Sequence, residues 1–135
     1  NKRAVQNISL EGNRQKPKVL FDWNKGVLAI KGRSLPEQAH DLYQPLLDWI
    51  DEYKKSPQEI TVFDIYLEYI NSSSNKYLLL MLKKLDDLFL SGNTVEINWH
   101  YDEDDEDLKE TAEECQRILS LKIKLCPEKT EEYDD

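Results

Sequence analysis

The middle of the chain reads ITVFDIYLEYI at residues 60–70, followed directly by NSSSN at residues 71–75. The first segment is rich in β-branched and aromatic residues, and we expect it to form a central strand covered on both faces. The second is entirely polar, and the apolar spacing after it predicts a helix from about Lys76 to Leu90, ended by Gly92. A buried strand that leads through polar residues into a helix is typical of α/β folds.

The residues before this segment predict a β-hairpin and a helix. Val19–Trp23 and Val27–Lys31 are apolar runs on either side of a turn at residues 24–26, and Gly32 is expected to end the second strand. Ser34 and Glu37 have the spacing of a capping box, which predicts that a helix starts there. Apolar residues then recur at the spacing of one buried helix face, at Ala39, Leu42, Tyr43, Leu46, Leu47, Trp49, Ile50 and Tyr53, and Pro45 between them should kink the helix.

The later residues predict a strand, a third helix and a last strand. Residues 95–101 alternate between apolar and polar side chains, a helix follows from the acidic segment to about Leu119, and residues 121–125 alternate again. With a short strand expected at residues 5–10, the order of elements predicts an α/β domain over residues 1–126. Its sheet should be mixed and largely parallel, with an N-terminal β-hairpin and about three helices. We expect residues 127–135 to be a flexible acidic tail.

Charge is unevenly distributed along the 135 residues, which have a net charge of −9. Residues 102–135 hold 14 acids and 5 bases, whereas residues 1–101 hold 13 of each. An acidic end repels phosphate, so we expect no binding to nucleic acid or to anionic membranes. No segment is apolar enough to span a bilayer, and residues 1–4 do not resemble a signal peptide, so a cytoplasmic protein is expected.

Two cysteines, Cys115 and Cys126, are too few for a disulfide framework, and we expect both to be reduced. The chain has no coiled-coil pattern, which makes a monomer the expectation. His40 and His100 are isolated in sequence and no catalytic or cofactor-binding motif is present, so the sequence predicts neither an enzyme nor a cofactor.

The polar segment at residues 71–75 is the first candidate site, because function in α/β folds concentrates where a strand ends and a helix begins. A helix N-terminus offers free amides and a favourable dipole to a phosphate. The alternative is structural, since serine and asparagine are common N-caps, although one cap needs only one such residue.

The six consecutive acids at residues 102–107 are the second candidate site. Their spacing is similar to that of a calcium-binding loop, but Asp107 stands where such a loop needs glycine, so we predict no metal site. Acids also favour the first turn of a helix. The alternative function is a constitutive protein-interaction domain or a metal-binding domain that uses this acidic run. Of these two uses, binding to a basic surface of a partner protein is favoured.

Four blocks of sequence within residues 19–108 resemble the SiaC family of bacterial regulatory phosphoproteins. The blocks are Phe21-Asp22 with Gly26, Leu28, Ile30, Gly32-Arg33-Ser34 and Pro36-Glu37; Pro45-Leu46 with Trp49 and Tyr53; Leu67 to Ser74; and Ile97-Asn98-Trp99 with Tyr101 to Asp107. The resemblance implies a STAS-like fold, similar to that of anti-sigma-factor antagonists. It also implies a non-enzymatic protein that a dedicated Ser/Thr protein kinase phosphorylates and a PP2C-type phosphatase dephosphorylates. The phosphorylation state would control binding to a signalling partner, by resemblance a diguanylate cyclase that acts in biofilm control.

The resemblance also implies the acceptor residue. The family's acceptor directly follows the asparagine of an Asn-Thr-Ser-Ser pattern, which here is Ser72, a serine in place of threonine, with Ser73 as a competing acceptor. The surface expected to bind partners comprises both candidate segments, namely Asn71, Ser73, Ser74, Lys76, Asp102, Glu103, Asp104 and Asp105.

Overall fold

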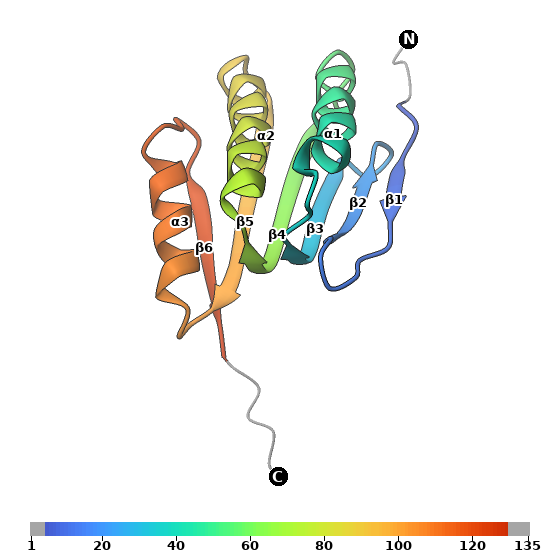
Figure 1. Cartoon of the computed structure of the whole chain (residues 1–135). Coiled ribbons are helices and arrows are strands. Elements are labelled where there is room, and N and C mark those ends of the chain that lie inside the picture. The colour runs from blue at the N-terminus through green and yellow to red at the C-terminus, as the bar shows by residue number, and fades with distance from the viewer. Residues whose placement is uncertain (1–4, 130–135) are drawn as a thin grey trace.

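The computed structural model describes residues 5–129, which form a six-stranded sheet with three helices (Figure 1). The elements in chain order are β1 (Ile8–Leu10), β2 (Lys18–Asp22), β3 (Val27–Ser34), α1 (Ala39–Tyr53), β4 (Ile60–Ile70), α2 (Ser72–Leu90), β5 (Thr94–Asp102), α3 (Glu106–Gln116) and β6 (Ile123–Glu128). The predicted hairpin, the three helices and the later strands are therefore confirmed.

The strands lie in the sheet in the order in which they occur in the chain, from β1 to β6. The pairs β1–β2 and β2–β3 are antiparallel, and the three pairs from β3 to β6 are parallel. This confirms the mixed, largely parallel sheet. Each helix connects two neighbouring parallel strands, and all three cover the same face of the sheet (Figure 1).

The prediction that β4 is covered on both faces is wrong. Thr61, Phe63, Ile65 and Leu67 are buried, whereas the alternate residues between them are only half-buried, and Glu68 is exposed. Because the strands follow one another in order, every crossover helix packs on one side and leaves the other side of β4 without a helix. The strand is thus buried on one face only.

The predicted capping box at Ser34 is also wrong. β3 does not end at Gly32 but continues to Ser34, with a shift in its register to β4 between Gly32 and Arg33. Helix α1 begins at Ala39 instead, and Gln38 before it makes no side-chain capping hydrogen bond. The Ser34 side chain is buried and hydrogen-bonded to the Tyr43 hydroxyl, which removes it from any capping role.

Other helix and strand ends differ from the predictions by a few residues. Helix α2 begins at Ser72 rather than near Lys76, and α3 ends at Gln116 rather than near Leu119. Strand β6 includes Pro127 and Glu128, which were expected to start the flexible tail. The expectations for residues 1–4 and for the tail beyond Lys129 lie outside the described residues.

The core lies between the sheet and the helices and forms one continuous cluster. The inward face of α1 is confirmed, with Leu42 half-buried and the other predicted positions buried. Trp99 and Phe63 are fully buried at the centre of the sheet, and Phe21 packs against both Trp49 and Phe63. These large rings fix the helices over one face of the sheet.

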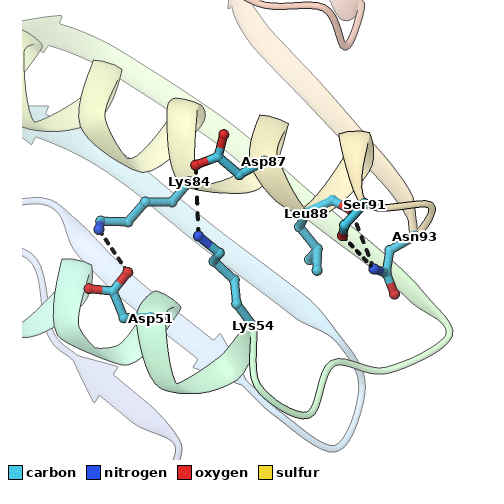
Figure 2. Close-up of polar contacts among 7 residues, drawn as sticks. All are labelled: Asp51, Lys54, Lys84, Asp87, Leu88, Ser91 and Asn93. Atoms are coloured by element: carbon cyan, nitrogen blue, oxygen red, sulfur yellow. Dashed lines mark hydrogen bonds and ion pairs between the residues drawn. The ribbon is translucent and has the colours of Figure 1, made fainter.

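Two ion pairs connect α1 to α2 at the surface (Figure 2). Lys84 Nζ lies 2.7 Å from Asp51 Oδ1, and Lys54 Nζ lies 3.8 Å from Asp87 Oδ2. Since all four side chains are partly solvated, each pair stabilises the fold by no more than about 1 kcal/mol. Burial of the apolar helix faces therefore holds α1 and α2 on the sheet.

Replacement of Gly26 by alanine should destabilise the protein more than the same change at Gly92. Both residues have positive φ, at +66° and +104°, but only at Gly26 would a Cβ atom collide with the backbone, at the Ile60 carbonyl oxygen. We expect a loss of about 1 kcal/mol for Gly92→Ala and about 3 kcal/mol or more for Gly26→Ala. Urea unfolding followed by tryptophan fluorescence measures both, and equal losses would contradict the predicted collision.

The two cysteines should differ in reactivity. Burial raises the pKa of the Cys115 thiol to about 11, with Glu114 acting in the same direction, whereas Cys126 is only half-buried. The thiolate is the reactive form, so native protein near neutral pH should take up one iodoacetamide, at Cys126. Mass spectrometry should find labels on both cysteines after unfolding in urea. Rapid native labelling of Cys115 would contradict this.

Candidate functional site

The start of α2 is fixed by Asn71, the last residue before the helix. The Asn71 side-chain oxygen accepts a hydrogen bond of 2.9 Å from the Ser74 amide, which is an N-cap. The Asn71 amide donates to the Ser34 carbonyl oxygen at 2.9 Å, which ties the turn to the end of β3. The asparagine therefore caps the helix, and the three serines after it form the first helical turn.

The three serines differ in exposure. Ser72 and Ser73 are exposed, whereas Ser74 is 0% exposed. The Ser34 and Ser74 hydroxyls lie beside the Tyr43 hydroxyl, where they lower the pKa of Tyr43 by less than burial raises it. Ser74 thus belongs to a buried polar cluster that joins β3, α1 and α2, and its side chain is not part of the surface.

A hollow of about 480 Å³ lies between the first turns of α1 and α2. Ser73, Lys76, His40 and Tyr77 line it, and the Tyr77 ring stacks on the Tyr43 ring with centroids 5.5 Å apart. His40 is exposed on the surface of α1. Ser73 is therefore an accessible hydroxyl next to a lysine and a histidine.

Helix α2 has 19 residues and no acidic residue in its first turn. The first turn of α1 contains Asp41, and that of α3 contains Glu106 and Asp107. Among α1, α2 and α3, only α2 thus has no carboxylate in its first turn to offset the positive end of the helix dipole.

The acidic run begins at the end of β5 and continues into α3. Asp105 caps α3 by accepting from the Leu108 amide at 3.0 Å, and Asp102 Oδ1 accepts from the Asp104 amide at 2.9 Å. Residues 5–129 contain no group of three or more histidine, cysteine or acidic side chains arranged to hold a metal ion. Capping and dipole compensation explain part of the run, and its arrangement gives the metal-binding alternative no support.

The two candidate segments lie at the same edge of the sheet. Ser72 follows the carboxyl end of β4 and Asp102 ends β5, and these strands are parallel neighbours (Figure 1). Their pairing stops at Ile65 and Trp99, after which β4 stays with β3 and β5 stays with β6. The two segments therefore lie at the same end of the parallel strands, although β4 and β5 are no longer paired with each other at that end.

A row of polar and aromatic side chains that the sequence did not predict lies on the face of the sheet that no helix covers. The Tyr66 and His100 rings stack with centroids 4.0 Å apart, Lys31 Nζ lies 5.8 Å from the Tyr66 centroid, and His100 Nδ1 lies 2.8 Å from Glu128 Oε1. His100 lies on the half-buried face of β5, opposite the core residues Trp99 and Tyr101. The alternation of Asp64, Tyr66 and Glu68 within residues 60–70 is the sequence signal of this open face.

Comparison with known proteins identifies the family. The model of the SiaC family regulatory phosphoproteins matches residues 10–128. The chain belongs to the SiaC family. An uncharacterised protein of Pseudomonas aeruginosa strain UCBPP-PA14 is 31% identical over 117 residues, which cover 87% of this chain and 93% of that protein.

Solved SiaC structures have the same fold. Apo-SiaC from Pseudomonas aeruginosa is 28% identical with a TM-score of 0.83, over 90% of this chain and 99% of that one. A structure of the diguanylate cyclase SiaD in complex with its activator SiaC, also from Pseudomonas aeruginosa, matches with 29% identity and a TM-score of 0.84, over 90% and 99% of the chains. The resemblance found in the sequence is confirmed, and the family is one of regulatory phosphoproteins. None of the helices within residues 5–129 could cross a bilayer.

Loss of the Asn71 cap should weaken the start of α2. Asn71→Ala removes the acceptor for the Ser74 amide, and we expect a loss of about 1 kcal/mol in the free energy of unfolding. Asn71→Asp keeps an acceptor and should restore most of that loss. Urea unfolding measures the stability, and hydrogen exchange of the amides of residues 73–75 reports the local effect. Faster exchange throughout α2 in Asn71→Asp would contradict a capping role.

Proposed function

We propose that this SiaC family member is a non-enzymatic phosphoswitch protein. A Ser/Thr protein kinase phosphorylates Ser72, with Ser73 as the second candidate, and a PP2C-type phosphatase removes the phosphate. The phosphorylation state controls binding to a signalling partner, a diguanylate cyclase, in the cytoplasm. The proposal rests on the exposure of Ser72 and Ser73 beside a helix cap that uses neither hydroxyl.

The exposure of the serines supports two acceptor positions rather than three. A kinase must bring the acceptor oxygen to the transferred phosphoryl group, which a fully buried hydroxyl prevents. The Ser74 hydroxyl is buried against Tyr43, so phosphorylation there would require α2 to separate from α1. Because Asn71 supplies the N-cap, the structural alternative for Ser72 and Ser73 loses its main argument.

The electrostatics of α2 favour a phosphate at its first turn. A phosphate adds about −1.5 to −2 charges at neutral pH and meets the dipole of a helix without acids in that turn. The fold therefore tolerates the modified form, and the added charge acts on what binds to the surface. A partner surface shaped for a neutral hydroxyl would be repelled.

The solved complex of SiaD with its activator SiaC supports a diguanylate cyclase as the class of partner. The surface proposed to bind it comprises Asn71, Ser73, Lys76 and the acids Asp102, Glu103, Asp104 and Asp105, all at the carboxyl edge of the parallel strands. Ser74, part of the expected surface, contributes through packing instead. Phosphate on Ser72 would add to the negative field of the acids at this edge and change which partner surfaces bind.

The acceptor can be assigned by mass spectrometry of protein purified from its native host. We expect one phosphate on the wild type and on Ser73→Ala, and none on Ser72→Ala. Both variants replace an exposed serine in the same helical turn, so each is the matched control of the other. A phosphate that persists in Ser72→Ala and disappears in Ser73→Ala would move the assignment to Ser73. No phosphate on the wild type under any growth condition would overturn the switch.

Partner control can be tested by pull-down of the host's diguanylate cyclases. We expect Ser72→Ala to retain a cyclase and Ser72→Asp to bind it about tenfold less tightly, because a fixed negative charge replaces the hydroxyl. Ser72→Asp should unfold at a slightly higher urea concentration than Ser72→Ala, because an acid in the first turn of α2 interacts favourably with the helix dipole, so weaker binding would not result from unfolding. Equal retention of the cyclase by both would support a constitutive interaction domain instead.

A further inference from the structure

The separation of β4 from β5 leaves a cleft at the carboxyl ends of these strands, lined by Tyr66 and His100 from the open face and by Tyr101 and Leu108 from the helix-covered side. Beyond the pair Ile65 and Trp99, β4 pairs only with β3, with Glu68 as the extra residue at the register shift, and residues 100–102 of β5 pair only with β6. The cleft between them has a volume of about 430 Å³, within the range of ligand sites in proteins. It lies at the carboxyl ends of parallel strands, where α/β folds commonly bind ligands.

The walls of the cleft are held in place by contacts between strands. Tyr66 from β4 stacks on His100 from β5, and Glu128 Oε1 from β6 accepts a hydrogen bond of 2.8 Å from His100 Nδ1. Tyr101 and Leu108 add apolar surface to the lining. The cleft thus combines a preformed aromatic wall with an apolar floor.

The charges around the cleft are unbalanced toward the negative. Four carboxylates line it, from Glu68, Asp102, Asp105 and Glu128, against two ammonium groups, from Lys31 and Lys129. Asp102 and Asp105 also line the neighbouring acidic hollow formed by the run at residues 102–107. The negative field of the cleft therefore continues outward along the surface, which attracts a cation and repels an anion.

The spacing of the carboxylates selects among cations. They come from β4, β5, β6 and the start of α3, and within residues 5–129 they do not converge as a metal site would require. A guanidinium group has five N–H donors in a planar fork and can bond to carboxylates that lie apart from one another. The aliphatic part of an arginine side chain would lie against Tyr101 and Leu108.

We propose that this cleft binds an arginine side chain presented by a basic segment of a partner protein, with Glu68 and Glu128 as its main ligands and the acidic run guiding the residues beside it. The inference rests on the proposed function in one respect, that the chain acts by binding a protein partner. It does not depend on phosphorylation, on the identity of the acceptor serine or on the class of partner.

The test is a titration of ¹⁵N-labelled, unphosphorylated full-length protein with an acetylated and amidated tri-arginine peptide, followed by NMR. We expect the largest chemical-shift changes at residues 66–68, 100–102 and 128. Glu68→Gln and Glu128→Gln should each weaken binding about fivefold, as expected for loss of one partly solvated charge pair. A tri-citrulline peptide, which has the same shape without the charge, should not bind.

Glu96→Gln is the matched control. Glu96 is an exposed acid on the same open face of β5 as His100 but near the opposite end of the strand, so its removal changes the net charge equally. It should leave the affinity unchanged. Equal weakening by Glu96→Gln, shift changes spread over the acidic surface, or equal binding of a tri-lysine peptide would each overturn the proposal. Because no kinase or cyclase is present, failure here leaves the phosphoswitch intact, and failure of the phosphoswitch leaves this titration interpretable.

Discussion

The loss of pairing between β4 and β5 beyond Ile65 and Trp99 determines how the two candidate segments are placed at the carboxyl ends of these strands. If the two strands stayed paired to their ends, the start of α2 and the acidic run would adjoin across a continuous ladder. Because the two strands separate, the end of β4, which leads into the serine turn, pairs with β3, and the end of β5, which leads into the acidic run, pairs with β6. The Asn71 amide then bonds to the Ser34 carbonyl, and the Glu103 amide to the Glu128 carbonyl. Each candidate segment is therefore hydrogen-bonded to a different neighbouring strand, the serine turn to β3 and the acidic run to β6.

The one-sided cover of the sheet follows from the sequential strand order and gives the two faces different roles. The helix-covered face supplies most of the stability, because it forms the apolar core, which includes Phe21 and Trp99. The open face contains polar and aromatic side chains that add little to that core, such as Tyr66 and His100. Changes on the open face should therefore have a smaller effect on folding than changes on the covered face.

The sequence predicted elements whose pattern is local and missed those that depend on distant neighbours. The alternation in β5 and the apolar face of α1 were predicted because each reflects burial on one side. The capping box at Ser34 failed because a tertiary hydrogen bond to Tyr43 takes that hydroxyl, and the late start of α2 failed because Asn71 already caps the helix. Ser72 could be singled out from family resemblance, but its exposure relative to Ser74 depends on how α1 packs. The cleft could not be predicted, because its position depends on the strand order, which no local sequence pattern contains.

The ends of the sheet limit how the protein can associate. Strand β1 at one edge has only three residues, and β6 at the other edge contains Pro127, which has no N–H to donate to an incoming strand. Lys124 adds a charge on the same edge strand. Neither border is a good template for another chain's backbone, so growth of the sheet from molecule to molecule is disfavoured. Contacts with other proteins are therefore left to side chains, and the sheet itself stays at six strands.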